Sequence, residues 1–252
     1  MSNGLAGKVV VITGASGGIG AAVAERITRD GATAILVARR ADALRQVEQR
    51  CAGRAIPMVA DLTKRGEVHR VVTELMVRVD HLDVWVNNVG RGITRMPSEL
   101  TDADLDAMID VNVRSALYGM QEALPIFKAQ GQGHFINVSS MLGRVPSTLR
   151  RSAYSASKHF LNSLTENFRT EVQETHPGIQ FSLVSPGVVY TDFGVHAMHG
   201  GPDSRALPNG QPVEEVAEVI AGVIVSRRPD VYTRAGAKQM VAAHFAATGE
   251  DP

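Results

Sequence analysis

The chain has 252 residues, of which 44% are hydrophobic and 21% charged, a composition typical of a globular protein long enough to bury a large core. Its formal net charge is zero and its pI is near 7.1, which gives no support to a nucleic-acid or membrane-surface partner. The single cysteine, Cys51, excludes an internal disulfide. Residues 1–7 contain no apolar run as long as that of a signal peptide, and no stretch of the chain has the ~20 apolar residues of a membrane span. We therefore expect a cytoplasmic protein.

Short apolar runs alternate with helical patterns along the whole chain. The first run, at 9–12, has the unbroken apolar character of a strand buried on both faces. We predict strands at 9–12, 34–37, 55–59, 82–86, 134–138, 181–184 and 231–233, and helices at 21–30, 41–51, 64–79, 101–129 (with Thr101 as N-cap), 152–175, 213–226 and 237–247. This alternation predicts an α/β protein, a single Rossmann-fold domain over residues 1–252, with a doubly wound parallel sheet of about seven strands and helices on both faces.

A glycine-rich turn joins the first predicted strand to the first predicted helix. Gly14, Gly18 and Gly20 lie in this turn, although three residues separate the first two glycines instead of the usual one. Glycines let the backbone approach a pyrophosphate, and a helix N-terminus supplies N–H groups and positive potential. An ordinary tight turn is the alternative, but the strand before it and the helix after it favour a dinucleotide site.

The end of the second strand bears on which dinucleotide binds. A carboxylate there would bind the ribose 2′-hydroxyl of NAD, but this chain has Ala38 followed by Arg39 and Arg40. A guanidinium can bind a 2′-phosphate through two hydrogen bonds. Two solvated arginines are the alternative, and we favour NADP(H) over NAD(H).

Tyr154 and Lys158 are four residues apart, which places them on one face of a helix. A nearby ammonium favours the phenolate and lowers the pKa of a tyrosine, so the pair can exchange a proton with a substrate oxygen. This spacing is also common by chance, and the pair gains meaning only beside the glycine turn.

With the turn and this pair in place, the chain resembles the short-chain dehydrogenase/reductase family over essentially its whole length. The resemblance rests on motifs in a specific order: the turn from Thr13 to Gly20, Asp61-Leu62, Asn87-Asn88-Val89-Gly90, Asn112, Ser139-Ser140, Tyr154-x-x-x-Lys158, and Pro186-Gly187 leading to Thr191. Val89 departs from the usual alanine, and the stretch from Ser140 to Tyr154 is about one residue longer than the commonest spacing.

The resemblance implies roles for these residues. Tyr154 would be the catalytic acid/base, and Lys158 would lower its pKa and bind the nicotinamide ribose. Ser140, preferred over Ser139 because of the segment that follows it, would hold the substrate oxygen, and Asn112 would anchor a water relay to the lysine. The cofactor would be bound by Gly14, Ser16, Gly18, Ile19, Gly20, Arg39, Arg40, Asp61 (at adenine), Leu62, Asn88, Gly90, Tyr154, Lys158, Pro186, Gly187, Val189 and Thr191 (at the carboxamide).

Each role has a plain structural alternative. Asn112 could be a solvated or kink-associated residue of a long helix, and Ser140 an ordinary hydroxyl at a strand end. Asp61 and Thr191 could cap helices, and for Asp61 both roles can hold together.

Residues 190–212 form the longest stretch without predicted regular structure, and loops of this length are usually functional. We expect a lid over cofactor and substrate, with Phe193, Val195 and Met198 as an apolar wall. A metal site at His196 and His199 is conceivable, but we expect no metal. Arg150 and Arg151 could receive an anionic substrate, and we favour solvated surface for both.

These features predict an oxidoreductase that transfers a hydride between NADP(H) and a carbonyl or secondary alcohol, as a ketone or aldehyde reductase. The alternatives are an NAD-dependent dehydrogenase of a sterol, sugar or other secondary alcohol, and a nucleotide-binding regulator without catalysis. We expect a small-molecule substrate, no nucleic-acid or membrane partner, and a homodimer or homotetramer formed through the helices at 101–129 and 152–175. The segments 141–153 and 190–212, which would select the substrate, carry no readable code.

Overall fold

The computed structural model describes residues 4–248. Residues 1–3 of the N-terminal segment, in which no signal peptide is expected, lie outside the described residues. Its strands are β1 (Val9–Thr13), β2 (Thr33–Ala38), β3 (Ala55–Val59), β4 (Val84–Asn87), β5 (Gly133–Val138), β6 (Ile179–Ser185) and β7 (Asp230–Tyr232). Its α-helices are α1 (Gly18–Arg29), α2 (Ala41–Arg50), α3 (Arg65–Arg78), α4 (Asp102–Ile109), α5 (Ser115–Gln130), α6 (Ser152–Gln173), α7 (Val213–Ser226) and α8 (Ala237–Ala246).

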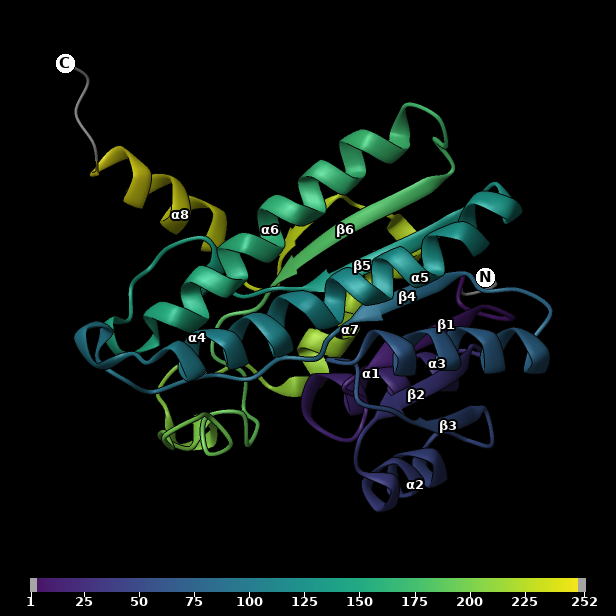
Figure 1. The fold of residues 1–252 in the computed structure, drawn as a ribbon, viewed down its shortest axis with the longest axis horizontal. Helices are drawn as coiled ribbons and strands as arrows, with labels where there is room; N and C mark the ends of the chain where they lie inside the picture. The colour runs from purple at the N-terminus through teal and green to yellow at the C-terminus, as the bar shows by residue number, and fades with distance from the viewer. Residues whose placement is uncertain (1–3, 249–252) are drawn as a thin grey trace.

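All seven strands join one parallel sheet in the order β3-β2-β1-β4-β5-β6-β7 (Figure 1). The order reverses between β1 and β4, and in such sheets ligands bind beyond the carboxyl ends of the strands at this point. The prediction of a single Rossmann-fold domain with a seven-stranded, doubly wound parallel sheet is confirmed. The glycine turn follows β1, directly beside the reversal.

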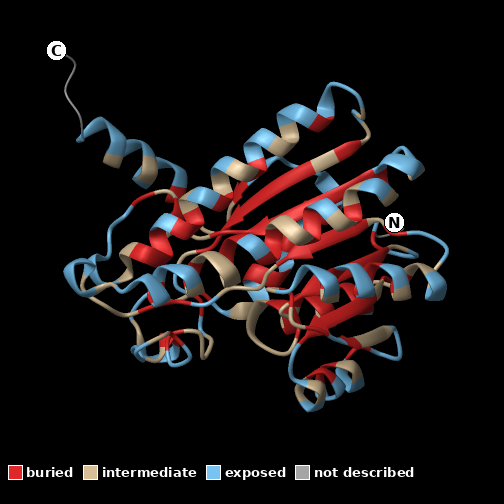
Figure 2. Ribbon diagram, viewed as in Figure 1, coloured by how far each residue is buried: buried red, intermediate tan, exposed pale blue. Residues whose placement is uncertain are grey.

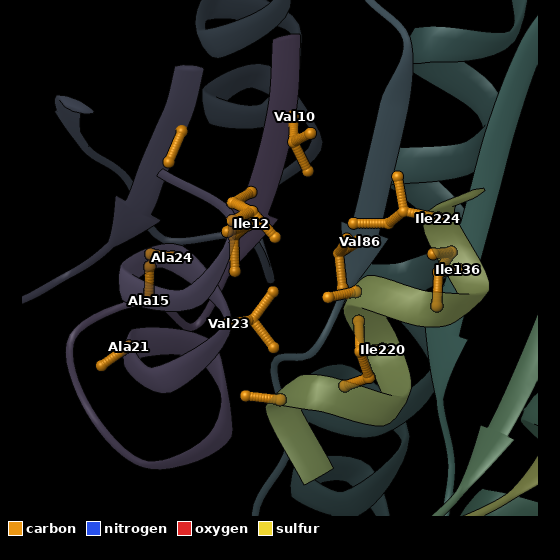
Figure 3. Packing of buried hydrophobic residues seen from close by; sticks show 14 of the residues in the cluster. Val10, Ile12, Ala15, Ala21, Val23, Ala24, Val86, Ile136, Ile220 and Ile224 are labelled. Atoms are coloured by element: carbon orange, nitrogen blue, oxygen red, sulfur yellow. The ribbon is translucent and has the colours of Figure 1, made fainter. Parts of the chain in front are cut away.

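Helices cover both faces of the sheet, and the strands are buried between them (Figure 2). Side chains that alternate along each strand divide into two cores. One core packs against α1, α2 and α7, and Figure 3 shows Val86 of β4 beside Ile220 and Ile224 of α7. The other packs against α3, α5 and α6 around Trp85 and Phe135. The sheet is therefore a rigid platform whose carboxyl edge carries the candidate site.

The helix predicted at 101–129 is present but not uniform. Thr101 is its N-cap, and its side chain forms a capping box with Asp104. Between α4 and α5 the backbone takes one π-helical turn at Asp110–Arg114, which includes Asn112. Such turns are frequent at functional sites, and this one was not predicted because helix propensity does not signal it.

The C-terminal helix α8 projects from the body of the molecule and is largely exposed (Figures 1 and 2). Among residues 4–248, no helix combines the length and the apolar character needed to cross a bilayer.

Candidate active site

The candidate site lies along the carboxyl ends of the central strands. The glycine turn follows β1, Asn88 and Gly90 follow β4, Ser140 follows β5, and Pro186 follows β6. Tyr154 and Lys158 reach this edge from the first turns of α6. The fold thus gathers residues as distant in the sequence as Gly14 and Pro186.

The glycine turn is shaped by close backbone approach. Gly14 and Gly18 have φ angles of +66° and +52°, the left-handed region that favours glycine. A Cβ on Gly20 would lie 2.6 Å from the carbonyl oxygen of Gly14 and 2.7 Å from Nδ2 of Asn88. Glycine is required at position 20 because those atoms cannot retreat without unmaking the turn. Ile19 is half-buried beside it at the start of α1.

Asn88 and Thr13 hold the turn against β4. The Asn88 amide donates to the Thr13 carbonyl oxygen at 3.0 Å, and the Asn88 backbone N–H donates to Thr13 Oγ1 at 2.9 Å. Val89 N–H donates to the same hydroxyl at 3.3 Å. Thr13 was not singled out from the sequence; a hydroxyl at the last position of a strand, just before a glycine turn, is the signal that could have identified it.

Arg40 lies over the glycine turn. Its Nη2 donates to Oγ of Ser16 at 3.1 Å and to the Ser16 carbonyl oxygen at 3.3 Å. Arg39 is exposed, and within the described chain its side chain forms no hydrogen bond or ion pair with a protein group. A guanidinium and a hydroxyl are therefore adjacent where β2 ends, which suits a phosphate on the ribose.

Asp61 and Leu62 lie beyond the end of β3. Asp61 Oδ1 accepts hydrogen bonds from the backbone N–H of Thr63 at 3.1 Å and from its hydroxyl at 2.8 Å. The N-cap of α3 is Lys64, so Asp61 shapes the turn before the helix and does not cap it. Leu62 is buried under this turn.

The Ser140 hydroxyl lies near the phenol of Tyr154 and acts to lower the pKa of that tyrosine. Ser140 follows β5, and its Oγ also accepts from the Leu142 backbone N–H at 3.1 Å. Ser139 is instead buried, and its hydroxyl donates to Asn162 Oδ1 at 2.5 Å. The structure thus places the hydroxyl of Ser140, and not that of Ser139, beside the tyrosine.

Lys158 is buried one helical turn from Tyr154. Its ammonium donates to the Val138 carbonyl oxygen at 2.9 Å and lies 5.9 Å from the centre of the Tyr154 ring. Burial lowers the pKa of Lys158 to about 8. Within the described chain the lysine therefore has one protein acceptor for three N–H groups, so two of its donors have no protein partner there.

The expectation that the pKa of Tyr154 lies below its ordinary value is wrong for this arrangement. Burial raises the pKa of Tyr154 to about 12, while the Ser140 hydroxyl and the charge of Arg151 act in the opposite direction. The tyrosine is 7% exposed, and the ring of Phe193 packs edge-on against it with ring centres 5.6 Å apart. Desolvation of the phenolate under this cover outweighs the Ser140 hydroxyl and the charge of Arg151.

Asn112 lies in the π-helical turn and is completely buried. Its Oδ1 accepts from the Arg91 backbone N–H at 2.9 Å, and its Nδ2 donates to the Arg91 carbonyl oxygen and to Ser157 Oγ, both at 3.0 Å. A Cβ on Gly90 would lie 3.4 Å from Asn112 Oδ1 and 3.5 Å from Lys158 Nζ. Asn112 and Lys158 therefore flank the same glycine, although they do not hydrogen-bond each other.

The segment after β6 completes the edge. Pro186 is buried, and its carbonyl oxygen accepts from Met141 N–H at 2.8 Å, while Gly187 is half-buried beside it. Thr191 Oγ1 accepts from Phe193 N–H at 3.3 Å, so it stabilises a turn and caps no α-helix. A Cβ on Gly18 would lie 3.6 Å from Thr191 Cγ2, which brings this segment against the glycine turn.

Residues 190–212 form a loop whose two ends meet. Val189 pairs with Gln211 through Tyr190 N–H and Gln211 N–H, which donate at 2.9 and 2.8 Å to the carbonyl oxygens of Gln211 and Val188. A 3₁₀ turn at Ser204–Ala206 is its one helical segment among the described residues.

The middle of this loop covers Tyr154. Met198 forms a bridge with Ile93, and Met198 and Phe193 pack against the cluster that contains Tyr154. Val195 is 48% exposed and takes no part in this apolar wall.

The two histidines of the loop have different carboxylate partners. His196 Nδ1 lies 3.2 Å from Asp192 Oδ2 within the loop, whereas His199 Nε2 lies 2.7 Å from Asp104 Oδ1 on α4. This contact is the largest cause of the lowered pKa of Asp104, about 2. His199 thereby fastens the loop to α4. In the described part of the chain, no group of three His, Cys, Asp or Glu side chains has the geometry to hold a metal ion.

Arg150 and Arg151 have different environments. Arg150 is exposed, as predicted. The prediction of a solvated Arg151 is wrong, because its Nη1 atom is buried and has no hydrogen-bond partner. Burial lowers the pKa of this arginine. Gly92 lies against its Nη1 atom, and Gly201 of the lid lies near its Nη2 atom.

A hollow of about 400 Å³ opens between the glycine turn and the loop; its lining includes Gly17, Gly18, Thr191 and Arg205. Tyr154 does not line it, because Phe193 and the loop cover the tyrosine.

Comparison with known proteins agrees with this geometry. The model of the short chain dehydrogenase family matches residues 8–199. An uncharacterized oxidoreductase of Staphylococcus aureus (strain MRSA252) is 31% identical over 217 residues, which are 86% of this chain and 90% of the relative. A short-chain dehydrogenase/reductase from Burkholderia phymatum, solved in complex with NAD, shares the fold with a TM-score of 0.87 over 98% of each chain at 23% identity. A metagenomic short-chain oxidoreductase, solved with NADP, is 30% identical with a TM-score of 0.76, over 91% of this chain and 97% of its own.

Proposed function

This chain belongs to the short-chain dehydrogenase family of oxidoreductases, and on that premise we propose that it transfers a hydride between NADP(H) and a carbonyl compound or secondary alcohol, acting as a ketone or aldehyde reductase. The observation that carries the proposal is the meeting of Tyr154, Ser140 and Lys158 beside the glycine turn. A proton donor and a hydrogen-bond donor thus adjoin a turn built for a dinucleotide.

The residues of the carboxyl edge fit a nicotinamide dinucleotide. The turn around Gly14, Gly18 and Gly20 would lie along its pyrophosphate, where a Cβ at position 20 would collide with the backbone. Asp61 and Leu62 would contact adenine, and Asn88, Gly90, Pro186, Gly187, Val189 and Thr191 would line the nicotinamide half. When bound, the cofactor supplies or accepts the hydride, so no metal is needed.

The side chains of this chain manage the proton and the substrate oxygen. In reduction, the Ser140 hydroxyl would donate a hydrogen bond to the carbonyl oxygen. The O–H bond of Tyr154 would then break as a new O–H bond forms on the substrate oxygen. Lys158, with two free donors, would stabilise the resulting phenolate, and Asn112 would hold the backbone at Arg91 beside it. Donors aimed in this way contribute about 10²–10³ each in rate.

Arg40 and Ser16 support NADP(H) over NAD(H). The Arg40 guanidinium already contacts the Ser16 hydroxyl at 3.1 Å, and no carboxylate ends β2 to repel a 2′-phosphate. The metagenomic relative was solved with NADP and the Burkholderia protein with NAD, so the family accepts both. Fluorescence titration with NADPH and NADH decides between them: tighter NADPH binding supports the proposal, and tighter NADH binding favours an NAD-dependent dehydrogenase.

We propose that residues 190–212 act as a lid. The ends of the loop are fixed by the pairing of Val189 with Gln211, while the contact of Phe193 with Tyr154 and that of His199 with Asp104 close its middle. Substrate could reach Tyr154 only after those contacts open. Limited proteolysis with and without NADPH tests this, and equal cleavage of the loop in both samples would argue against a lid.

We propose a homodimer or homotetramer formed through α5 and α6. Phe160 on the outward side of α6 is 52% exposed, an apolar side chain of the size that subunit interfaces bury. Light scattering after size-exclusion chromatography measures the mass directly, and a monomer at micromolar concentration would contradict the proposal.

The reaction is tested by the loss of nicotinamide absorbance when NADPH is mixed with a panel of ketones, aldehydes and diketones. Turnover of at least one compound that depends on Tyr154 supports the proposal. Binding of NADPH without turnover of any compound in either direction would favour a nucleotide-binding regulator.

A further inference from the structure

Buried polar atoms without partners gather on one side of Tyr154. Among residues 4–248, four buried side-chain polar atoms lack a hydrogen-bond partner: Thr94 Oγ1, His134 Nδ1, Arg151 Nη1 and Ser152 Oγ. Three of the four belong to two short segments, 92–95 and 148–152, that flank the tyrosine. Buried polar groups without partners are rare in folded proteins, and each calls for an explanation such as a bound water, an ion or a functional role.

The two segments and the lid pack directly against one another. Arg95 N–H donates to the Arg150 carbonyl oxygen at 3.0 Å, and Thr94 N–H donates to the Met198 carbonyl oxygen at 3.0 Å. A Cβ on Gly92 would collide with Arg151 Nη1, so the guanidinium rests on the Gly92 backbone. Arg151 is thus held in place by packing and by no counter-charge.

Two donors converge at the inner side of the lid. The point that a Cβ on Gly201 would occupy is 3.0 Å from Arg151 Nη2 and 3.0 Å from Thr94 Oγ1, a hydrogen-bond distance from both. The Gly194 carbonyl oxygen is 2.6 Å from the same point, so the lid must move outward before an anion can reach the two donors.

The positive charge of Arg151 beside Thr94 suits a ligand that carries one negative charge. No carboxylate pairs with Arg91, Arg150 or Arg151 in the described part of the chain. One guanidinium and one hydroxyl complement a carboxylate, whose two oxygens fit the planar fork of an arginine. A phosphate monoester carries about −1.5 to −2 at neutral pH and would remain under-neutralised here.

From this arrangement we infer that the substrate carries a carboxylate as well as the reacting carbonyl, and that Arg151 and Thr94 bind that carboxylate. The inference rests on the proposed function, because it concerns the same site. Phe193 and Ala197 pack around Gly92 beside the guanidinium, so the carbon chain that joins the two groups is apolar. The substrate class is therefore an oxo acid in reduction or the corresponding hydroxy acid in oxidation.

The test compares acids with their neutral esters. We would measure kcat/KM with NADPH for pyruvate, 4-oxopentanoate, 6-oxoheptanoate and 4-acetylbenzoate, each beside its methyl ester. For at least one pair, the acid is expected to be favoured about 10- to 100-fold, the value of a hydrogen-bonded charge pair. Arg151→Gln should remove that preference, whereas the ester should change only through the charge of Arg151 on Tyr154. A merely structural role would lower the turnover of acid and ester equally.

Two further variants keep the test decisive. Thr94→Val removes one donor without a change of charge and should lower the acid preference about 3- to 10-fold, even where Arg151→Gln fails to fold. Arg150→Gln removes the same charge from the exposed neighbour and should leave both substrates unchanged.

The outcomes separate this inference from the proposed function. Equal kcat/KM for acid and ester in every pair, or equal loss of both in Arg151→Gln, overturns the carboxylate site while carbonyl reduction stands. If no compound is turned over, the proposed function fails. Calorimetric titration of 4-acetylbenzoate then decides the site alone, because binding lost in Arg151→Gln supports it and absent or unchanged binding overturns it.

Discussion

The cofactor edge and the lid side of Tyr154 are built in opposite ways. At the glycine turn, Asn88 and Thr13 satisfy one another and the backbone, and Gly20 fits with no space to spare. On the lid side, the Lys158 ammonium is buried with one acceptor, and the half-buried Arg151 has a buried Nη1 atom with none. Burial of unpaired charges opposes folding, whereas complementary packing favours it. Changes at the edge should therefore cost stability and function together, and changes on the lid side should separate the two.

Gly20→Ala should have the largest effect, and it should lower both the stability of the protein and its affinity for NADPH. Its Cβ would lie 2.6 Å from the Gly14 carbonyl oxygen, so the turn must distort. We expect unfolding to become easier by about 1–3 kcal/mol, the usual cost of overpacking, and NADPH affinity to fall at least about 100-fold. Urea denaturation measures the free energy of unfolding, and fluorescence titration measures the NADPH affinity.

The matched control is Gly222→Ala in the exposed middle of α7, where a Cβ meets no atom within 4 Å. It should stabilise the protein by about 0.5–1 kcal/mol, because alanine is the better helix former. Normal NADPH affinity in Gly20→Ala would contradict the role given to the turn.

Lys158→Met should separate function from stability. Turnover should fall about 10²-fold or more, while the free energy of unfolding at pH 7 should rise by about 1 kcal/mol because a buried charge is removed. The folded-state pKa of Lys158 is about 8, below its ordinary value, so the unfolded chain retains a proton that the folded protein loses above pH 8. Wild-type stability should thus rise with pH between about 8 and 10.5, and the variant should lack that rise.

Urea denaturation at pH 7, 8, 9 and 10 measures both parts of this prediction. Parallel pH profiles of wild type and Lys158→Met would show that the lysine is not the buried titrating group.

Arg40→Gln should affect one cofactor only. Loss of a charged hydrogen bond to the 2′-phosphate should weaken NADPH binding about 10- to 100-fold and leave NADH binding unchanged. Arg45→Gln, which removes an exposed arginine paired with Asp42 on α2, is the control and should alter neither affinity. Equal weakening of both cofactors by Arg40→Gln would mean that Arg40 supports the turn around Ser16 instead.

His199→Asn should have the smallest effect, confined to the lid. His199 has a φ of +60°, which asparagine tolerates, so the change removes the contact with Asp104 and keeps the backbone. Since Asp104 keeps its pairing with Arg95, the loop loses one contact only, and proteolysis of residues 190–212 should accelerate about two- to fivefold. His196→Asn, whose partner Asp192 lies within the loop, should show no acceleration.

The same contrast explains what could be predicted from the sequence. The seven strands, the N-cap at Thr101 and the glycine turn depend on local patterns and on backbone requirements, which residue types reveal directly. The preference for Ser140 over Ser139 came from the family resemblance, and the structure puts Ser140 beside Tyr154.

The burial of Arg151 and the raised pKa of Tyr154 on the lid side depend on contacts between segments distant in the chain. They were therefore not predicted from the sequence. The burial of Arg151 requires Gly92 and Gly201 to pack around it, and the raised pKa of Tyr154 requires Phe193 to cover its ring. The π-helical turn at Asn112 likewise results from tertiary bonds to Arg91 and Ser157, which no helical periodicity encodes.

The most direct measurement is NADPH-dependent carbonyl reduction by Tyr154→Phe beside wild type. Phenylalanine keeps the packing with Phe193 and removes the only atom of the residue that can give a proton. We predict stability close to that of wild type, NADPH affinity lowered by no more than about threefold through the lost hydroxyl contact, and turnover reduced at least about 10³-fold, since the positioned acid is lost. Turnover within a few-fold of wild type would contradict the assignment of Tyr154 as the proton donor.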